Sequence, residues 1–138
     1  MKTLYTADVT AQGGRDGRVR SQDGVLDLPL SVPKSMGGPG LAATNPEQLF
    51  AAGYSACFES ALRLVARKRG TLLTSASITA EVSLNLTDQG AYQLGVKLHA
   101  HLPDVPRDTA EALAQAAHQV CPYSNATRGN VDVQIVVD

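Results

Sequence analysis

Residues 78–102 read ITAEVSLNLTDQGAYQLGVKLHAHL and contain two alternating segments on either side of one turn. Alternation of apolar and polar residues with a period of two is typical of strands that bury one face. The turn is expected at Asp88–Gly90, which supplies turn-forming residues. The stretch therefore predicts an antiparallel hairpin. The apolar residues that alternate with polar ones are Ile78, Ala80, Val82, Leu84 and Leu86, then Tyr92, Leu94, Val96, Leu98, Ala100 and Leu102.

A long amphipathic helix is expected before this hairpin. Thr44 or Asn45 can cap its first free amides, and Thr44 with Glu47 matches a capping box. Gly70 can adopt the left-handed conformation that closes a helix, so the helix should end there. One wide apolar stripe along it would be buried against a sheet or a second helix. The stripe comprises Leu49, Phe50, Gly53, Tyr54, Cys57, Phe58, Ala61 and Val65.

The other segments complete an alternation of strands and helices. Early strands are expected over Thr3–Thr10 and Arg18–Leu30, a loop over Ser31–Thr44, a second helix over about Arg107–Gln119 and a closing strand over Val131–Val137. The order of strands, helix, hairpin, helix and strand is typical of an α+β domain with an antiparallel sheet.

Length and charge narrow the classes of function. A chain of 138 residues is most simply a single domain, 1–138, with a core that needs no staples. Its 12 basic and 13 acidic residues nearly cancel, so neither nucleic acid nor an anionic membrane is an expected partner. No segment resembles a signal peptide or a membrane span, which favours a cytoplasmic location. Disulfides that form in the cytosol are commonly transient and catalytic.

Two cysteines, Cys57 and Cys121, are the only thiols in the chain. A buried cysteine is commonly an inert small apolar residue, and that reading applies to each one taken alone. Each nevertheless lies inside a distinctive stretch: Asn45–Phe58 reads NPEQLFAAGYSACF, and His118–Asn130 reads HQVCPYSNATRGN. Two such thiols in a reducing compartment favour a two-thiol redox reaction.

These two stretches, with Gly13–Gly24 reading GGRDGRVRSQDG, resemble the organic hydroperoxide resistance proteins of the OsmC/Ohr family. The resemblance runs nearly from end to end. It implies antiparallel sheets wrapped around central helices in an intertwined homodimer. It also implies reduction of organic hydroperoxides, with no bound cofactor and with lipoyl groups on carrier proteins as the external dithiol reductant.

The resemblance assigns roles to four positions of this sequence. The family's reactive cysteine falls on Cys57, its resolving cysteine on Cys121, its arginine on Arg15 and its glutamate on Glu47. In the implied reaction, a Cys57 sulfenic acid condenses with Cys121 to form a disulfide. A dithiol then reduces that disulfide.

Physical reasoning adds an arrangement for these residues. A thiol attacks as its thiolate, so Cys57 needs a nearby cation, and Arg15 in a glycine-rich turn is the best candidate. Glu47 would orient Arg15 by a bidentate ion pair. Ten residues separate Glu47 from Cys57, a rise of roughly 15 Å on a straight helix. We therefore expect Arg15 and Glu47 to face Cys57 and Cys121 of the other chain in a two-fold dimer, unless the helix breaks at Gly53.

The aromatic residues around the reactive cysteine predict the substrate preference. Phe50, Tyr54 and Phe58 recur at helical spacing around Cys57. An apolar pocket formed by these three rings would favour organic hydroperoxides over hydrogen peroxide.

Three alternatives involve the same region. His118 with Cys121 could suggest a metal pair, but only His99 and His101 remain as further nitrogen ligands, so no metal is expected. A Cys-His hydrolase would use Cys57 as nucleophile and His118 as base, and it predicts no role for Cys121. A redox sensor or a carrier of apolar ligands would use the pocket without turnover.

Overall fold

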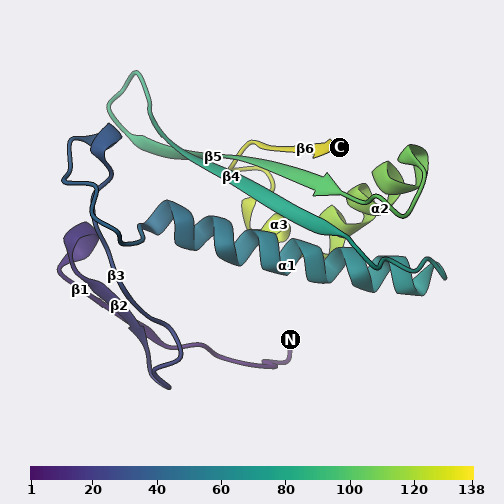
Figure 1. Cartoon of the computed structure of the whole chain (residues 1–138), viewed down its shortest axis with the longest axis horizontal. Helices are drawn as coiled ribbons and strands as arrows, with labels where there is room; N and C mark the ends of the chain where they lie inside the picture. Colours follow the sequence, from purple (N-terminus) through teal and green to yellow (C-terminus); the bar gives the residue numbers. More distant parts are fainter. The chain divides into compact units, whose positions relative to one another are not determined.

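The computed structural model describes all of residues 1–138. The chain forms two compact units, unit 1 over Met1–Leu49 and unit 2 over Phe50–Asp138. Each unit contains one three-stranded sheet, in the order β1-β2-β3 and β4-β5-β6 respectively. Figure 1 shows the elements in chain order, with the helices concentrated in unit 2. The expected α+β class is confirmed.

Unit 1 contains an antiparallel sheet of short strands. These are β1 (Val9–Gln12), β2 (Arg18–Ser21) and β3 (Asp27–Pro29). A single turn of 3₁₀ helix, η1 (Gly14–Asp16), joins the first two strands. The chain reverses between β2 and β3 through a turn that includes Gly24 at φ 76°.

The expected first strand is wrong over most of its length. The prediction placed it at Thr3–Thr10, whereas β1 begins at Val9. The reason is the length of its partner: Val9 pairs with Ser21, the last residue of β2, and the chain turns immediately afterwards. The amide of Gln22 still donates to the carbonyl of Asp8 at 2.9 Å, but the preceding residues have no β2 residue opposite them.

The expected loop over Ser31–Thr44 is confirmed. It contains one further 3₁₀ turn, η2 (Lys34–Met36), and no strand. Its ends lie close together, since Leu30 forms an isolated bridge with Thr44 and the Ser31 amide donates to the Thr44 carbonyl at 3.0 Å.

Helix α1 runs from Pro46 to Lys68 without a break at Gly53. Asn45 is its cap, because Asn45 Oδ1 accepts from the Gln48 amide at 2.8 Å. The expected capping box is therefore wrong, since the Thr44 hydroxyl bonds to the Gln48 side chain instead. At the other end, Gly70 has φ 71°, and the Thr71 amide donates to the Ala66 carbonyl at 2.9 Å. This Schellman closure confirms the predicted end of the helix.

The predicted hairpin is confirmed in unit 2 as β4 (Ser77–Leu86) and β5 (Tyr92–His101). Its ten residue pairs run from Ser77 opposite His101 to Leu86 opposite Tyr92. The closing strand is β6 (Val133–Val137), two residues shorter than the prediction. It pairs with β5 in the parallel direction, so the sheet is mixed rather than purely antiparallel.

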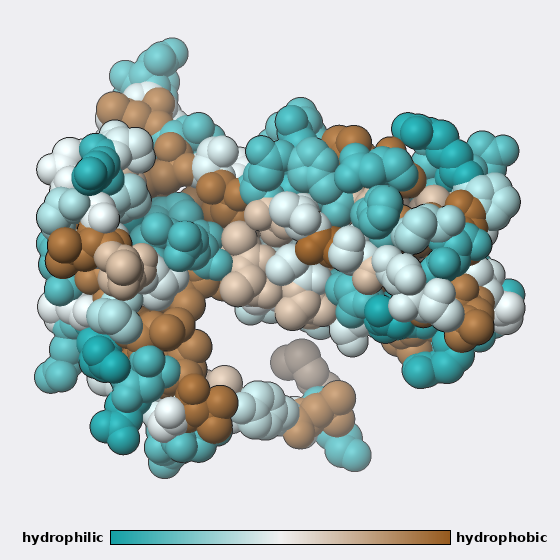
Figure 2. Space-filling model, in the orientation of Figure 1, coloured by the Kyte–Doolittle hydropathy of each residue, from teal (hydrophilic) through white to brown (hydrophobic).

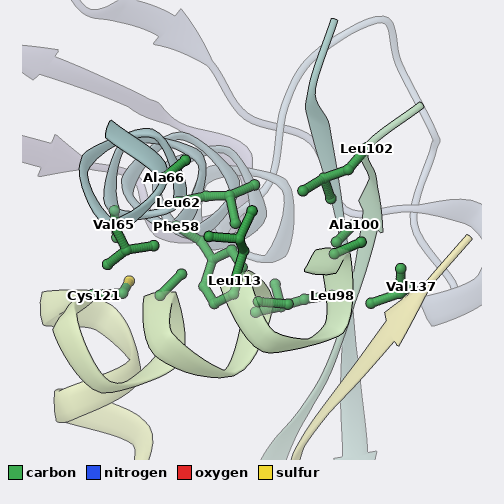
Figure 3. Close-up of a cluster of buried hydrophobic side chains, with 14 of the residues drawn as sticks. Phe58, Leu62, Val65, Ala66, Leu98, Ala100, Leu102, Leu113, Cys121 and Val137 are labelled. Carbon is green, nitrogen blue, oxygen red and sulfur yellow. The ribbon is translucent and has the colours of Figure 1, made fainter. Parts of the chain in front are cut away.

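Two helices connect β5 to β6. They are α2 (Arg107–Val120), close to the predicted bounds, and α3 (Pro122–Thr127), which the sequence analysis did not anticipate. Apolar residues of α1, α2 and the sheet form one core, and Figure 3 shows side chains from α1, β5 and α2 converging, with Cys121 in the same cluster. The most deeply buried large members are Tyr54, Phe58, Leu62, Leu98 and Leu113.

The surface of unit 2 is mixed in character. Hydrophilic residues cover much of its visible face, with hydrophobic residues in small groups between them (Figure 2). Leu86 and Tyr92, where β4 and β5 meet the hairpin turn, are among the exposed hydrophobic residues. None of the helices is long and apolar enough to span a membrane.

Candidate active site

The two cysteines lie together in unit 2. Cys57 is near the middle of α1, and Cys121 is the junction residue between α2 and α3. Both are free thiols, and the Cys121 side chain is a hydrogen-bond partner of Cys57. Cys121 is fully buried and Cys57 is half-buried. The fold therefore brings the thiol of α1 and the thiol of the α2–α3 junction together, with only Cys57 reachable from outside.

The surroundings of Cys57 within unit 2 favour its protonated form. Burial is the largest influence and raises the pKa of the Cys57 thiol above its ordinary value. The backbone N–H of Tyr123 acts in the opposite direction by donating to the sulfur, while the Cys121 thiol adds to the increase. Attack by Cys57 as a thiolate at neutral pH thus requires a further source of positive potential.

Tyr123 is a site residue that the sequence analysis missed. Its phenol lies against Gly53 of α1, where a Cβ atom would come within 2.5 Å of the phenol oxygen. The Tyr123 ring also contacts Phe50 edge-on at a centroid distance of 6.1 Å and Tyr54 at 5.6 Å. The signal in the sequence was indirect: a glycine in the middle of a helix is unfavourable and often marks a close approach by another group.

The three aromatic residues expected to form a pocket differ in exposure. Phe50 is half-buried and packs edge-on against Tyr54, with ring centroids 6.2 Å apart. Tyr54 and Phe58 have no exposed surface. Phe50 and the partly exposed Tyr123 are thus the rings near Cys57 that a ligand could touch in this chain, while Tyr54 and Phe58 support them from the core.

Arg15 and Glu47 form the expected bidentate ion pair in unit 1. Arg15 Nη1 donates to Glu47 Oε2 at 2.8 Å, and Arg15 Nη2 donates to Glu47 Oε1 at 2.6 Å. The backbone after η1 passes very close to Gln12 at Gly17. A Cβ atom on Gly17 would come within 1.6 Å of the Gln12 carbonyl oxygen. No side chain larger than hydrogen fits there, so the turn that presents Arg15 depends on this glycine.

The ion pair also sets the charge state of Glu47. The hydrogen bonds from Arg15 lower the pKa of the Glu47 carboxyl below its ordinary value, against a smaller opposing effect of burial. Glu47 is therefore ionised at neutral pH, and its carboxylate holds the planar guanidinium in one orientation.

The hydrogen-bond partner of His118 is Ser124 and not Cys57. Its Nδ1 lies 2.8 Å from the Ser124 hydroxyl, and burial lowers the pKa of its imidazole. The observation disfavours the Cys-His hydrolase. The other two histidines lie on β5, where His99 pairs with Glu81 across the hairpin and His101 is exposed.

Comparison with known proteins places this geometry in a family. The family model described as "OsmC-like protein" matches residues 37–136. The chain belongs to the OsmC-like protein family. It is 47% identical over 137 residues to the organic hydroperoxide resistance protein of Xanthomonas axonopodis pv. citri, covering 99% of this chain and 96% of that one. It is 51% identical over 137 residues to organic hydroperoxide resistance protein OhrA of Bacillus subtilis, covering 97% and 96% respectively.

A solved structure agrees with this membership. The crystal structure of the organic hydroperoxide resistance protein OhrB of Bacillus subtilis is similar, with a TM-score of 0.92 and 46% identity over 99% of this chain and 100% of that one. In this OsmC-like chain, the thiol pair lies within unit 2 and the Arg15–Glu47 pair lies within unit 1.

Proposed function

We propose that this OsmC-like protein is a thiol-dependent peroxidase that reduces organic hydroperoxides to alcohols. The contact between Cys57 and Cys121 carries the proposal, because a sulfenic acid formed on one thiol would have the other beside it. The high similarity to organic hydroperoxide resistance proteins, which covers almost the whole chain, supports the substrate class and a role in the response to oxidative stress.

The reaction balances with two thiols and one peroxide. The Cys57 thiolate attacks the outer oxygen of the hydroperoxide, the O–O bond breaks, and the alkoxide leaves as an alcohol after taking up a proton. The product is a sulfenic acid on Cys57. The Cys121 sulfur then attacks the Cys57 sulfur, which forms the disulfide and releases water. An external dithiol reduces the disulfide by two exchange steps and is itself oxidised.

Arg15 is the proposed source of positive potential. Within unit 2, burial leaves the Cys57 thiol with a raised pKa, so a cation from elsewhere has to favour the thiolate. A guanidinium can do this and also stabilise the negative charge on the departing oxygen. Glu47 holds Arg15 by two hydrogen bonds, which gives the guanidinium a defined orientation.

We further propose that the site is shared between two copies of the chain. Helix α1 is continuous through Gly53, and a rise of about 1.5 Å per residue puts Glu47 far from Cys57 along its axis. In a homodimer with antiparallel α1 helices, Arg15 and Glu47 of one protomer would face the two cysteines of its partner.

An external dithiol, of which lipoyl groups are the expected example, would restore the thiols, and no bound cofactor takes part. The proposed reaction would take place in the cytoplasm, where a disulfide that forms and is reduced in each cycle is chemically reasonable.

Turnover of cumene hydroperoxide with dihydrolipoamide as reductant tests the function, with hydrogen peroxide as the comparison substrate. We expect organic-selective turnover that Cys57→Ser abolishes. Cys121→Ser should still be oxidised once at Cys57 but should lose turnover by the intramolecular disulfide. Absence of turnover in the wild-type protein, with both thiols titratable, would contradict a peroxidase and favour a sensor or a carrier.

A further inference from the structure

A buried array of polar side chains lies next to the thiol pair. Its members are Tyr54 on α1, His118 on α2, and Ser124 and Thr127 on α3, and we call them the Ser124 array. The Ser124 hydroxyl is 2.8 Å from the Tyr54 hydroxyl and 2.8 Å from His118 Nδ1. Tyr54, Ser124 and Thr127 are buried, with exposed fractions of 0%, 0% and 4%. Polar groups in an apolar core cost free energy unless they are paired. The hydroxyl groups of this array are paired with one another, which indicates that the array has a specific role.

Only one direction of hydrogen bonding gives each contact of the array its own proton. Each hydroxyl donates once, and the Thr127 hydroxyl donates to the Ser124 carbonyl at 3.2 Å. Tyr54 therefore donates to Thr127, 3.2 Å away, and Ser124 donates to Tyr54. His118 Nδ1–H then donates to Ser124. In the reverse direction, Tyr54 would donate to Ser124, and the contact between Tyr54 and Thr127 would have no proton.

This direction specifies the state of His118. Its Nδ1 carries a hydrogen, and burial, assisted by the charge of Arg128, lowers the pKa of its imidazole. The ring is thus neutral at neutral pH and adopts the Nδ1–H tautomer. The side chain of Arg128 also donates to the His118 backbone carbonyl at 2.5 Å, which fixes the end of α2 further.

Two members of the Ser124 array flank Cys121 in the sequence. Cys121 follows the last residue of α2 and precedes the first residue of α3, and its amide donates to the Ala117 carbonyl at 2.8 Å. His118 lies three residues before it and Ser124 three residues after it. Both are joined through hydrogen bonds to Tyr54, which lies about one helical turn before Cys57 on α1. The same turn of α1 therefore carries Cys57 and the anchor for the Cys121 junction.

We propose that Ser124, with Tyr54 and His118, positions Cys121 for disulfide formation with Cys57. The inference rests on the proposed two-thiol function but concerns a different step, the condensation rather than the attack on peroxide. The three side chains are positioning residues, because they act through the α2–α3 junction and touch no reacting atom. Their contribution is a raised effective concentration of one thiol at the other.

The effective concentration can be measured without any peroxide. The full-length protein is equilibrated with glutathione buffers of graded redox potential, and the Cys57–Cys121 disulfide is quantified. We expect Ser124→Ala to lower the effective concentration by about tenfold, which corresponds to about 30 mV for a two-electron couple. Tyr54→Phe, which keeps the ring and removes only the hydroxyl, should act in the same direction and replaces Ser124→Ala if that variant fails to fold.

A matched control separates positioning from loss of stability. Leu73→Ala opens a cavity in the same core. Leu73 lies beyond the end of α1, and its carbonyl accepts from Arg63, nine residues after Tyr54 on that helix. The substitution should lower the free energy of unfolding and leave the effective concentration within twofold of wild type, a threshold small beside the tenfold effect expected above. His118→Asn keeps an N–H group near the Nδ1 position and should retain more of the wild-type value than His118→Leu.

A peroxide experiment tests the same inference in the reaction. Ser124→Ala should be oxidised by cumene hydroperoxide at the wild-type rate but should hold the Cys57 sulfenic acid about tenfold longer, as measured by trapping with dimedone. If wild type is not oxidised at all, the proposed function fails while the glutathione result still decides the role of the array. A wild-type effective concentration in both Ser124→Ala and Tyr54→Phe, or an Nε2–H tautomer of His118 by nitrogen NMR, would overturn the inference.

Discussion

The Tyr123 phenol occupies the space that a side chain on Gly53 would fill. A Cβ there would lie 2.5 Å from the phenol oxygen and 3.0 Å from Cζ, so α1 and the Tyr123 side chain of α3 approach closely at this point. The backbone N–H of the same tyrosine donates to the Cys57 sulfur. The close approach at Gly53 and the environment of the thiol are therefore linked through one residue.

Gly53→Ala should have a larger effect on the reactivity of the Cys57 thiol than on the free energy of unfolding. Alanine is favoured over glycine within a helix by about 1 kcal/mol, which offsets part of the cost of displacing the Tyr123 ring. We expect a free energy of unfolding within about 1 kcal/mol of wild type and an altered rate of Cys57 alkylation. The double variant with Tyr123→Ala should show a non-additive effect of about 0.5 kcal/mol or more. Strict additivity would mean that the two residues do not interact.

Removal of the second thiol should lower the pKa of the first. Cys121 raises the pKa of Cys57 both as a hydrogen-bond partner and through charge. In Cys121→Ala both effects are absent, so the alkylation rate of Cys57 at neutral pH should rise and its pH midpoint should fall. The ultraviolet absorbance of the thiolate provides a second measure. An unchanged or higher midpoint would contradict the contact between the thiols.

The ion pair of Arg15 with Glu47 should stabilise unit 1 in a pH-dependent way. The pKa of Glu47 is lowered in the folded state, so its contribution is present above the unfolded pKa and is lost as the pH falls through the folded pKa. Partial solvent screening limits it to about 1 kcal/mol. The difference in unfolding free energy between wild type and Glu47→Gln should therefore shrink on acidification. Glu111→Gln, which removes a carboxylate from an exposed pair with Arg107, is the control for the loss of a surface charge.

The core of unit 2 should depend strongly on β5. Leu98 has no exposed surface, and Leu98→Ala should cost about 2–5 kcal/mol because it removes apolar contacts and leaves a cavity. The matched control is Leu72→Ala, whose leucine is 78% exposed, with an expected change of about 0.5 kcal/mol or less. Urea denaturation of both variants measures the difference. Equal losses would contradict the assignment of the inner face of the sheet.

The sequence predicted the elements whose signals are local. The alternation in residues 78–102 indicated β4 and β5, and Gly70 indicated the end of α1. The first strand was misplaced because its extent depends on its partner β2 and not on its own composition. The parallel direction of β6 could not be read either, since a strand pattern indicates which face is buried but not the direction of pairing.

In the candidate site, too, the sequence indicated some residues, and only the structure shows the role of others. The resemblance to a family indicated Cys57 and Cys121, and the structure brings these two thiols together. The Ser124 array was not foreseen, because residues 122–127 are mostly polar and showed no helical periodicity. The partner of Ser124 on α1, Tyr54, was assigned to a pocket, and only the tertiary structure shows that its hydroxyl bonds to a residue distant in the sequence.

The parallel pairing of β6 with β5 has a consequence for the newly made chain. A parallel connection must cross over the sheet, and here the crossover consists of α2, Cys121 and α3. Synthesis proceeds from the N-terminus, so α1 and the hairpin leave the ribosome first. Cys57 then exists as a solitary thiol until the crossover has folded back and β6 has docked at the edge of β5. The nascent protein passes through a period in which Cys57, once a peroxide has oxidised it to a sulfenic acid, can condense with a foreign thiol because its internal partner Cys121 is not yet in place.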